Sequence, residues 1–230
     1  MRLRQICLVA ADLRPAETAL LDALGLEVAF RDPAIGQFGL RHGLYPVGDR
    51  LLEIVSPRTG DTTAGRYLER RGGDAGYMVI LQTEDLAAAR SRVEGAGIRI
   101  VTVAEGPGVT GLHLHPKDVG GALLSVDRAQ PPDSWGWAGD DWRYHARGEV
   151  VTDLVGAEVA AADPDFVAER WSVVAGRPAH GRSIALDDAT ISFVPADARG
   201  DALSGMSLVA ADRTRAGESL VVCGTRIDLV

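Results

Sequence analysis

Few residues of this chain combine a reactive side chain with a setting that suits chemistry. Glu53 lies inside the apolar run LLEIV, where a strand would place it on one sheet face among apolar neighbours. A carboxylate there costs free energy unless it is paired, protonated or solvated, and it is well placed for proton transfer. Two interpretations stay open: Glu53 is a general base, or it is solvated or paired with an arginine. Gln5 also lies between apolar residues, and we expect it to hydrogen-bond Glu53 or a ligand.

The histidines offer a second group of candidates. His113 and His115 are two residues apart, so their side chains share one strand face, and such a pair can chelate a metal. Because His115 directly precedes Pro116 at a turn, we favour His113 lining the sheet and His115 capping the turn. Arg41 and His42 lie in one strand-like run, and we expect one of them to meet an anionic ligand, since arginine binds carboxylates through a fork.

Composition limits the classes of function. The chain has 230 residues, 46% hydrophobic and 24% charged, as in ordinary globular proteins. Its net charge of -8 argues against nucleic acids and anionic membranes as partners, because both require a basic face. No apolar run approaches the ~18 residues of a membrane span, and the start of the chain shows no signal-peptide pattern. The two cysteines exclude a disulfide framework. We expect a cytoplasmic monomer or homodimer that binds a small molecule.

The elements that must position these residues are repeated. Strands are predicted at residues 3–10, 27–30, 38–47 and 51–55, with a helix over ADLRPAETALLDALGL. The same order, β-α-β-β-β, returns over residues 77–126 around the helix EDLAAARSRVEGAG. QICLVAADL aligns with MVILQTEDL, and LEIVSP with LSVDRA. A duplication of this length is a stronger signal than any single motif in the chain.

The rest of the chain divides into a linker and a shorter pair of repeats. Residues 129–150 are rich in proline and tryptophan, and we expect Trp135, Trp137 and Trp142 to be buried because of their size. Residues 151–230 hold a third copy, with a helix between Asp163 and Gly176, and a fourth copy that lacks its helix. The predicted domains are therefore residues 1–128 and 151–230, joined by the linker 129–150.

This repeat resembles the vicinal oxygen chelate superfamily, which includes glyoxalase I, bleomycin-resistance proteins, methylmalonyl-CoA epimerase and extradiol dioxygenases. The resemblance is carried by LRQICLVAADL, LGLEVAF, LLEIVSP, GYMVILQTEDL, EGAGIRIV and LHLHPKDVGGALLSVD. It implies an α+β fold in which βαβββ modules form cupped mixed sheets with helices on the convex side. The cup would hold a small ligand, usually beside a divalent metal.

The resemblance also implies where metal ligands would lie. Carried onto this sequence, the four places are Gln5, Glu53, Met78 and Ser125. The superfamily uses His or Gln, then Glu or Gln, then His, then Glu. A thioether and a hydroxyl do not replace an imidazole and a carboxylate for a hard or borderline ion, so we predict no metal and no other cofactor. In residues 151–230, Asp228 is the one carboxylate at an equivalent place.

Three functions are consistent with the resemblance, and the fold alone does not choose among them; because the electrophile is missing, we rank binding first and the enzyme second. The first is metal-free binding of a small organic molecule, with Gln5, Glu53, Met78, Ser125, Arg41 and His113 as ligand contacts. The second is a lyase, isomerase or epimerase with Glu53 as general base, or a dioxygenase-like member with a non-standard metal site. Proton abstraction beside a carbonyl needs an electrophile, for which Arg41, His113 or a backbone amide would serve. The third is an interaction protein whose cup is filled by its own side chains.

Overall fold

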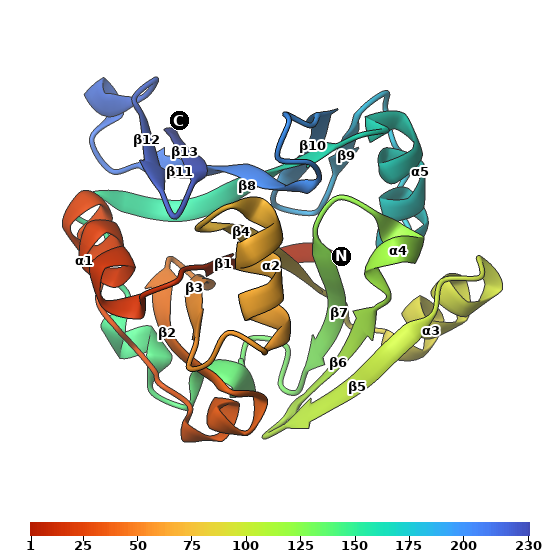
Figure 1. Ribbon diagram of the computed structural model, residues 1–230, viewed down its shortest axis with the longest axis horizontal. Helices are drawn as coiled ribbons and strands as arrows, with labels where there is room; N and C mark the ends of the chain where they lie inside the picture. Colours follow the sequence, from red (N-terminus) through yellow and green to blue (C-terminus); the bar gives the residue numbers. More distant parts are fainter.

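The computed structural model describes residues 1–230, which form two curved mixed sheets flanked by helices (Figure 1). The first sheet has seven strands in the order β2-β3-β1-β4-β7-β6-β5. β1 pairs with β3 in parallel and with β4 antiparallel, and β4 pairs with β7 in parallel. Its strands are β1 (Arg2–Val9), β2 (Leu40–Val47), β3 (Arg50–Pro57), β4 (Ala75–Gln82), β5 (Ile100–Gly106), β6 (Val109–Leu114) and β7 (Leu123–Ala129).

The two helices predicted in this half, α1 and α3, form within the expected segments. In α1 (Leu13–Leu24) the side chain of Asp12 caps the first turn, and Gly25 ends the helix with a φ of 63°, a conformation that glycine adopts without steric cost. In α3 (Leu86–Gly95) the cap is Asp85. Both helices pack on the convex face of the sheet. The remaining helices are η1 (Pro33–Phe38), α2 (Thr63–Arg71) and α4 (Pro116–Val119).

The second half repeats the plan with fewer elements. Its six-stranded sheet has the order β12-β13-β11-β8-β10-β9. A single long helix, α5 (Pro164–Ala175), follows the first strand, and only the short η4 (Arg213–Arg215) stands where the fourth module would have its helix. The strands are β8 (Val151–Ala161), β9 (Ser183–Ala185), β10 (Thr190–Pro195), β11 (Ala202–Ala210), β12 (Ser219–Val222) and β13 (Thr225–Leu229). None of the helices is long and apolar enough to cross a membrane.

The convex faces of the two sheets contribute to one hydrophobic core. This core includes Ile6 and Leu8 of β1, Leu20 of α1, Trp171 of α5 and Leu203 of β11. At the centre β4 and β11 approach so closely that a methyl group at Gly76 would collide with the carbonyl group of Leu203. The sheets therefore lie back to back, and their concave faces point away from one another.

The segment 130–150, here called the strap, runs across the concave face of the first sheet. Trp135 and Trp142 are 1% and 2% exposed, and they pack with Leu44, Leu51 and Ile80. Trp137 is half-buried. The prediction that the tryptophans pack is thus confirmed fully for two and partly for the third. The buried guanidinium of Arg4 lies over the rings of Trp135 and Trp142, with its Cζ 4.9 and 5.2 Å from their centroids.

One predicted strand is absent from the structure, and one helix was not predicted. Residues 27–30 form no strand, only a single bridge between Phe30 and Leu44, because the sheet already has its edge partner in β2. Residues 63–71, which showed no clear helix signal, form α2 with Thr62 as N-cap and Gly72 as C-cap. Ala64 and Leu68 of α2 pack against Val9 and Val55. The repeated α+β architecture itself is confirmed.

We expect the strap to contribute strongly to stability. Replacing the buried Trp135 by alanine should lower the free energy of unfolding by about 3–5 kcal/mol, as for other large-to-small core changes. Urea denaturation followed by circular dichroism measures this loss. The matched control is Tyr144→Ala, because Tyr144 belongs to the same strap and is 79% exposed; its effect should stay within about 0.5 kcal/mol. Equal effects of the two changes would show that the strap does not pack on the sheet in solution.

Candidate functional site

The four places named from the sequence share the concave face of the first sheet. Along β1 the side chains of Ile6 and Leu8 enter the main core, whereas Gln5 and Cys7 lie on the other face. Ser125 alternates in the same way with its core neighbours on β7. Met78 packs against the side-chain clusters of the concave face.

A chain of hydrogen bonds fixes Glu53 in this face. The backbone N–H of Asp32 donates to Nε2 of His42 over 2.8 Å, so the proton of this ring lies on Nδ1, which is 2.6 Å from Oε1 of Glu53. The Gln5 amide donates to Oε2 of Glu53 over 2.8 Å. The indole N–H of Trp135 donates to Oε1 of Gln5 over 2.8 Å. Each oxygen of Glu53 therefore has a donor, and each donor has its own orienting partner.

The sequence left open whether Arg41 or His42 faces the concave side, and in the structure it is His42. It is buried and faces Glu53, whereas Arg41 is exposed. Tyr45 enters the main core on the convex side. Arg41 lies on the same face of β2 as Tyr45, because side chains alternate along a strand, so Arg41 points away from the concave face. The structure gives Arg41 no contact with Glu53, Met78 or Ser125. His115 caps α4 by accepting from the N–H of Lys117, as the sequence predicted.

A second polar stripe runs along β6 and β7. His113 lies opposite Ser125 in the strand pairing, and Gly111 lies opposite Asp127. The imidazole of His113 makes no hydrogen bond within the chain, and burial lowers its pKa below the usual value. The Ser125 hydroxyl and one oxygen of Asp127 are buried without a partner. The other Asp127 oxygen accepts from the indole N–H of Trp137 over 2.8 Å.

Asp127 has an unusual protonation equilibrium for a carboxyl group. Burial raises its pKa to about 6, partly offset by the nearby Ser125 hydroxyl and Trp137 indole. At neutral pH a small part of Asp127 is thus still protonated. Its sequence context, VDRA at the end of a strand, gave no signal, because the burial arises from Trp137 of the strap. The hydrogen bond between Gln5 and Trp135 also depends on the strap, so the local sequence gave no signal for it either.

Cys7 lies beside this site as a protonated thiol. It is 2% exposed, and burial, together with the neighbouring Glu53, raises its pKa well above the usual value. Burial also raises the pKa of Cys223 to about 12. Neither cysteine forms a disulfide. A thiol without thiolate character is a poor nucleophile, so both cysteines are packing residues.

The donors at the four places do not fit a divalent metal. Both oxygens of Glu53 and the amide oxygen of Gln5 already accept hydrogen bonds within the chain. Met78 and Ser125 offer a thioether and a hydroxyl, which hard and borderline ions bind poorly. The chain holds no group of three or more His, Cys, Asp or Glu side chains arranged to ligate an ion.

The second sheet has a different concave face. Arg226 donates to Glu158 over 2.8 Å and to Asp228 over 2.9 Å, and Ser219 donates to Asp228 over 2.6 Å. Of the sequence-derived equivalents, Ile191 is in the main core, because its neighbour Ser192 takes the outward position. Asp228 is thus part of a surface ion-pair network.

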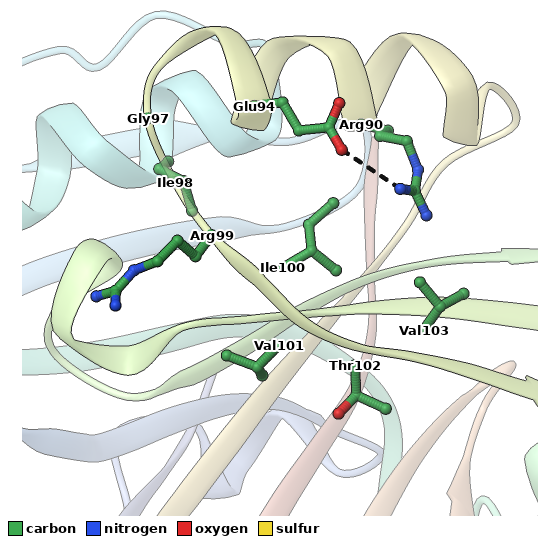
Figure 2. A pocket seen from close by; sticks show the side chains of 9 residues that line it. All are labelled: Arg90, Glu94, Gly97, Ile98, Arg99, Ile100, Val101, Thr102 and Val103. Atoms are coloured by element: carbon green, nitrogen blue, oxygen red, sulfur yellow. Dashed lines mark hydrogen bonds and ion pairs between the residues drawn. The ribbon is translucent and has the colours of Figure 1, made fainter.

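Much of the first concave face is already covered. The strap lies over one part of it and α2 over another. Between them Glu53, Met78, His113 and Leu123 keep partial contact with solvent, and the side chain of Glu53 is 12% exposed. We call these four residues the open band. A groove of about 540 Å³ lies elsewhere, between α3 and β5 (Figure 2).

Comparison with known proteins agrees with this fold. The family model for the Glyoxalase/Bleomycin resistance protein/Dioxygenase superfamily matches residues 2–126. The chain belongs to this superfamily, as its repeats and its cupped sheet indicated.

The curated relatives are epimerases. Ethylmalonyl-CoA/methylmalonyl-CoA epimerase of Cereibacter sphaeroides is 26% identical over 132 residues, covering 55% of this chain and 97% of that protein. Mitochondrial methylmalonyl-CoA epimerase of Mus musculus is 24% identical over 131 residues, covering 56% of this chain and 73% of the relative.

Two solved structures share the fold. A methylmalonyl-CoA epimerase in complex with methylmalonyl-CoA superposes with a TM-score of 0.52 at 21% identity, covering 58% of this chain and 98% of that one. A mutant of 4-hydroxymandelate synthase from Streptomyces coelicolor has a TM-score of 0.69 at 18% identity. It covers 90% of this chain and 70% of the synthase, so the likeness extends over both sheets.

The ligand types at the four places predict that substitution can create a metal site. The double variant Met78→His, Ser125→Glu supplies the imidazole and carboxylate that the superfamily places there. It should bind Zn²⁺ or Ni²⁺ at least tens-fold more tightly than the wild type, because added ligands also orient one another. Isothermal titration calorimetry of the double variant, the wild type and Met78→His alone measures this. No gain in the folded double variant would mean that the four places do not converge.

The raised pKa of Asp127 predicts that the free energy of unfolding depends on pH. Its pKa in the folded state, about 6, lies above that of an unfolded aspartate, about 3.9. The stabilisation from its protonated form is complete below the unfolded pKa and is lost as the pH rises through about 6. Relative to Asp127→Asn, the wild type should therefore lose on the order of 2–3 kcal/mol between pH 3.5 and pH 7. Urea titrations of both proteins across this range measure the difference. The exposed Asp133→Asn should show no such pH dependence.

Proposed function

We propose that this protein binds a small organic molecule at the open band of its first sheet, without the divalent metal that its superfamily commonly uses. The supporting observation is the partial exposure of Glu53, Met78, His113 and Leu123 in a face that is otherwise buried. Met78 and Leu123 offer apolar contact, and His113 and Glu53 offer hydrogen bonds at fixed positions. A few placed polar groups among apolar walls are typical of small-molecule sites.

The strap and α2 restrict the size of this ligand. Trp135 and Trp142 occupy the sheet beyond Gln5, and Leu68 and Ala64 occupy it beyond Val55. The ligand must therefore lie across the sheet between the two, with one edge at Glu53 and the other at His113. Ser125 and Gln5 support the floor beneath it, since both are buried.

A second candidate is proton transfer by Glu53, as an epimerase or isomerase would use it. The observation in its favour is the placement of the carboxylate by His42 and Gln5, together with the epimerase relatives. This mechanism also needs an electrophile that stabilises the enolate. Arg41 lies away from the concave face, and only His113 has free nitrogen atoms there. We therefore place binding first.

A fragment screen by thermal shift tests binding at the open band. Compounds that bind should stabilise the wild type in proportion to their concentration, and Met78→Trp, which fills the band, should weaken them at least tenfold. Val221→Trp is the control, because Val221 is 69% exposed on the other sheet. Compounds that bind Met78→Trp as well as the wild type would place the ligand elsewhere.

Solvent exchange tests the second candidate separately. Wild type incubated with methylmalonyl-CoA in D₂O should exchange no substrate proton faster than the uncatalysed rate, as followed by NMR. Catalysed exchange that falls by about 10²-fold or more in Glu53→Gln, the size expected for loss of a general base, would replace the binding proposal by the enzymatic one.

A further inference from the structure

Glu53 is a carboxylate without a cationic partner in the chain. Its hydrogen bonds come from the Gln5 amide, over 2.8 Å, and from the ring of His42, over 2.6 Å. Because Nε2 of His42 accepts the backbone N–H of Asp32, this ring carries one proton and no net charge. The side chain of Glu53 is 12% exposed, and each carboxylate oxygen can accept a second hydrogen bond. The carboxylate is therefore open to a further donor.

None of the arginines around this face forms an ion pair with Glu53. Arg4 donates to two backbone carbonyl groups and lies against the tryptophan rings of the strap. Arg31 holds a carboxylate of α1 through both oxygens. Arg41 points away from the concave face, and Arg70 lies over a tyrosine ring of α2. The chain thus leaves the charge of Glu53 without a counter-ion.

The second sheet treats its carboxylates differently. On its concave face Glu158 and Asp228 share the guanidinium of Arg226, over 2.8 and 2.9 Å. Each carboxylate there has a cationic partner from the same chain. The missing counter-ion is therefore a property of the first sheet, where the open band lies.

The charge of Glu53 acts on the side chains around the open band. Burial raises the pKa values of Cys7 and Tyr77, and the charge of Glu53 raises both further. Burial lowers the pKa of His113, and Glu53 acts on it in the opposite direction. All three side chains thus experience a negative potential. Because Coulomb interactions are stronger in poorly hydrated places than in water, this part of the sheet attracts positive charge.

The other residues of the open band suit a short cation with an apolar body. Met78 and Leu123 offer apolar contact next to Glu53. The ring of His113 makes no hydrogen bond within the chain, and its lowered pKa keeps it uncharged at neutral pH, so it can bind a polar group without repelling a cation.

We propose that the ligand of the open band is a small organic cation, a protonated amine on an apolar body, whose ammonium group binds the carboxylate of Glu53. This inference rests on the binding function proposed above and names the class of its ligand. An ammonium donor forms a charge-assisted hydrogen bond with a carboxylate, roughly twice as strong as a neutral one, and it supplies the counter-ion that the chain lacks. A carboxylate on the same body would meet like charge and be rejected.

Matched sets of probes test the ligand class. Each set has one apolar body, cyclohexyl, phenyl or indolyl, that carries an aminomethyl, a hydroxymethyl or a carboxyl group. Dissociation constants are measured by NMR titration at neutral pH. Within a set, the aminomethyl compound should bind the wild type at least tenfold more tightly than the hydroxymethyl compound, and the carboxyl compound should bind most weakly.

Glu53→Gln tests which group causes the preference. The substitution keeps the size of the side chain and removes its charge, so aminomethyl compounds should bind this variant no more tightly than hydroxymethyl compounds. Glu158→Gln is the matched control, because Arg226 already pairs with that carboxylate, and it should keep the wild-type ranking. Circular dichroism establishes that both variants are folded. If Glu53→Gln does not fold, the ranking in the wild type still decides the ligand class.

The outcomes separate this inference from the binding proposal. Hydroxymethyl or carboxyl compounds that bind as tightly as their aminomethyl counterparts, and that Met78→Trp weakens, would overturn the cationic ligand and leave binding at the open band intact. A preference for amines that persists in Glu53→Gln would also overturn it. If Met78→Trp weakens the binding of no probe, the open band is not the site, and both proposals are wrong.

Discussion

The guanidinium of Arg4 is a fully buried cation on the concave face, and the surrounding residues are arranged to hold it. Its Nη atoms donate to the carbonyl groups of Asp49 over 2.6 Å and Ser134 over 3.2 Å, and the faces of Trp135 and Trp142 cover it. Burial lowers the pKa of Arg4 to about 10, so the group remains charged at neutral pH. Because a buried charge without partners is very costly, the strap that supplies three of these partners is a fixed part of the site.

This arrangement also reaches Glu53. Trp135 covers Arg4 with its ring and orients Gln5 with its N–H, and Gln5 in turn holds the carboxylate. The position of the carboxylate thus depends on a segment that follows the first sheet in sequence. No lysine or arginine contacts Glu53, so its charge is stabilised by hydrogen bonds alone. Such a site favours a ligand that presents a hydrogen-bond donor to it.

The sequence predicted the architecture well where the signals are local. The repeats and the helix over ADLRPAETALLDALGL follow from periodicity within single elements, whereas the places Gln5, Glu53, Met78 and Ser125 came from the resemblance to the superfamily. The contacts that define the site were less predictable. His42 and Arg41 are adjacent, and only the actual register of β2 shows which of them faces Glu53.

The features that the sequence missed depend on contacts between distant segments of the chain. Asp127 is buried by Trp137, and Gln5 is fixed by Trp135, across separations that no local pattern reports. The helix α2 has only nine residues, which is too short for a clear repeating pattern, and it packs on Val9 and Val55 beneath it. Residues 27–30 have a strand-like composition, yet they form only one bridge with the sheet, between Phe30 and Leu44.

The two sheets, each built from a pair of modules, pack back to back within one chain. The strap is the covalent tether between them. Because of this tether, each half experiences the other at an effective concentration in the millimolar range, on the order of that for short linkers, whatever the total concentration of protein. The contact between Gly76 and Leu203 therefore does not weaken on dilution, as an interface between separate subunits would. Only an association between whole chains remains sensitive to how much protein the cell makes.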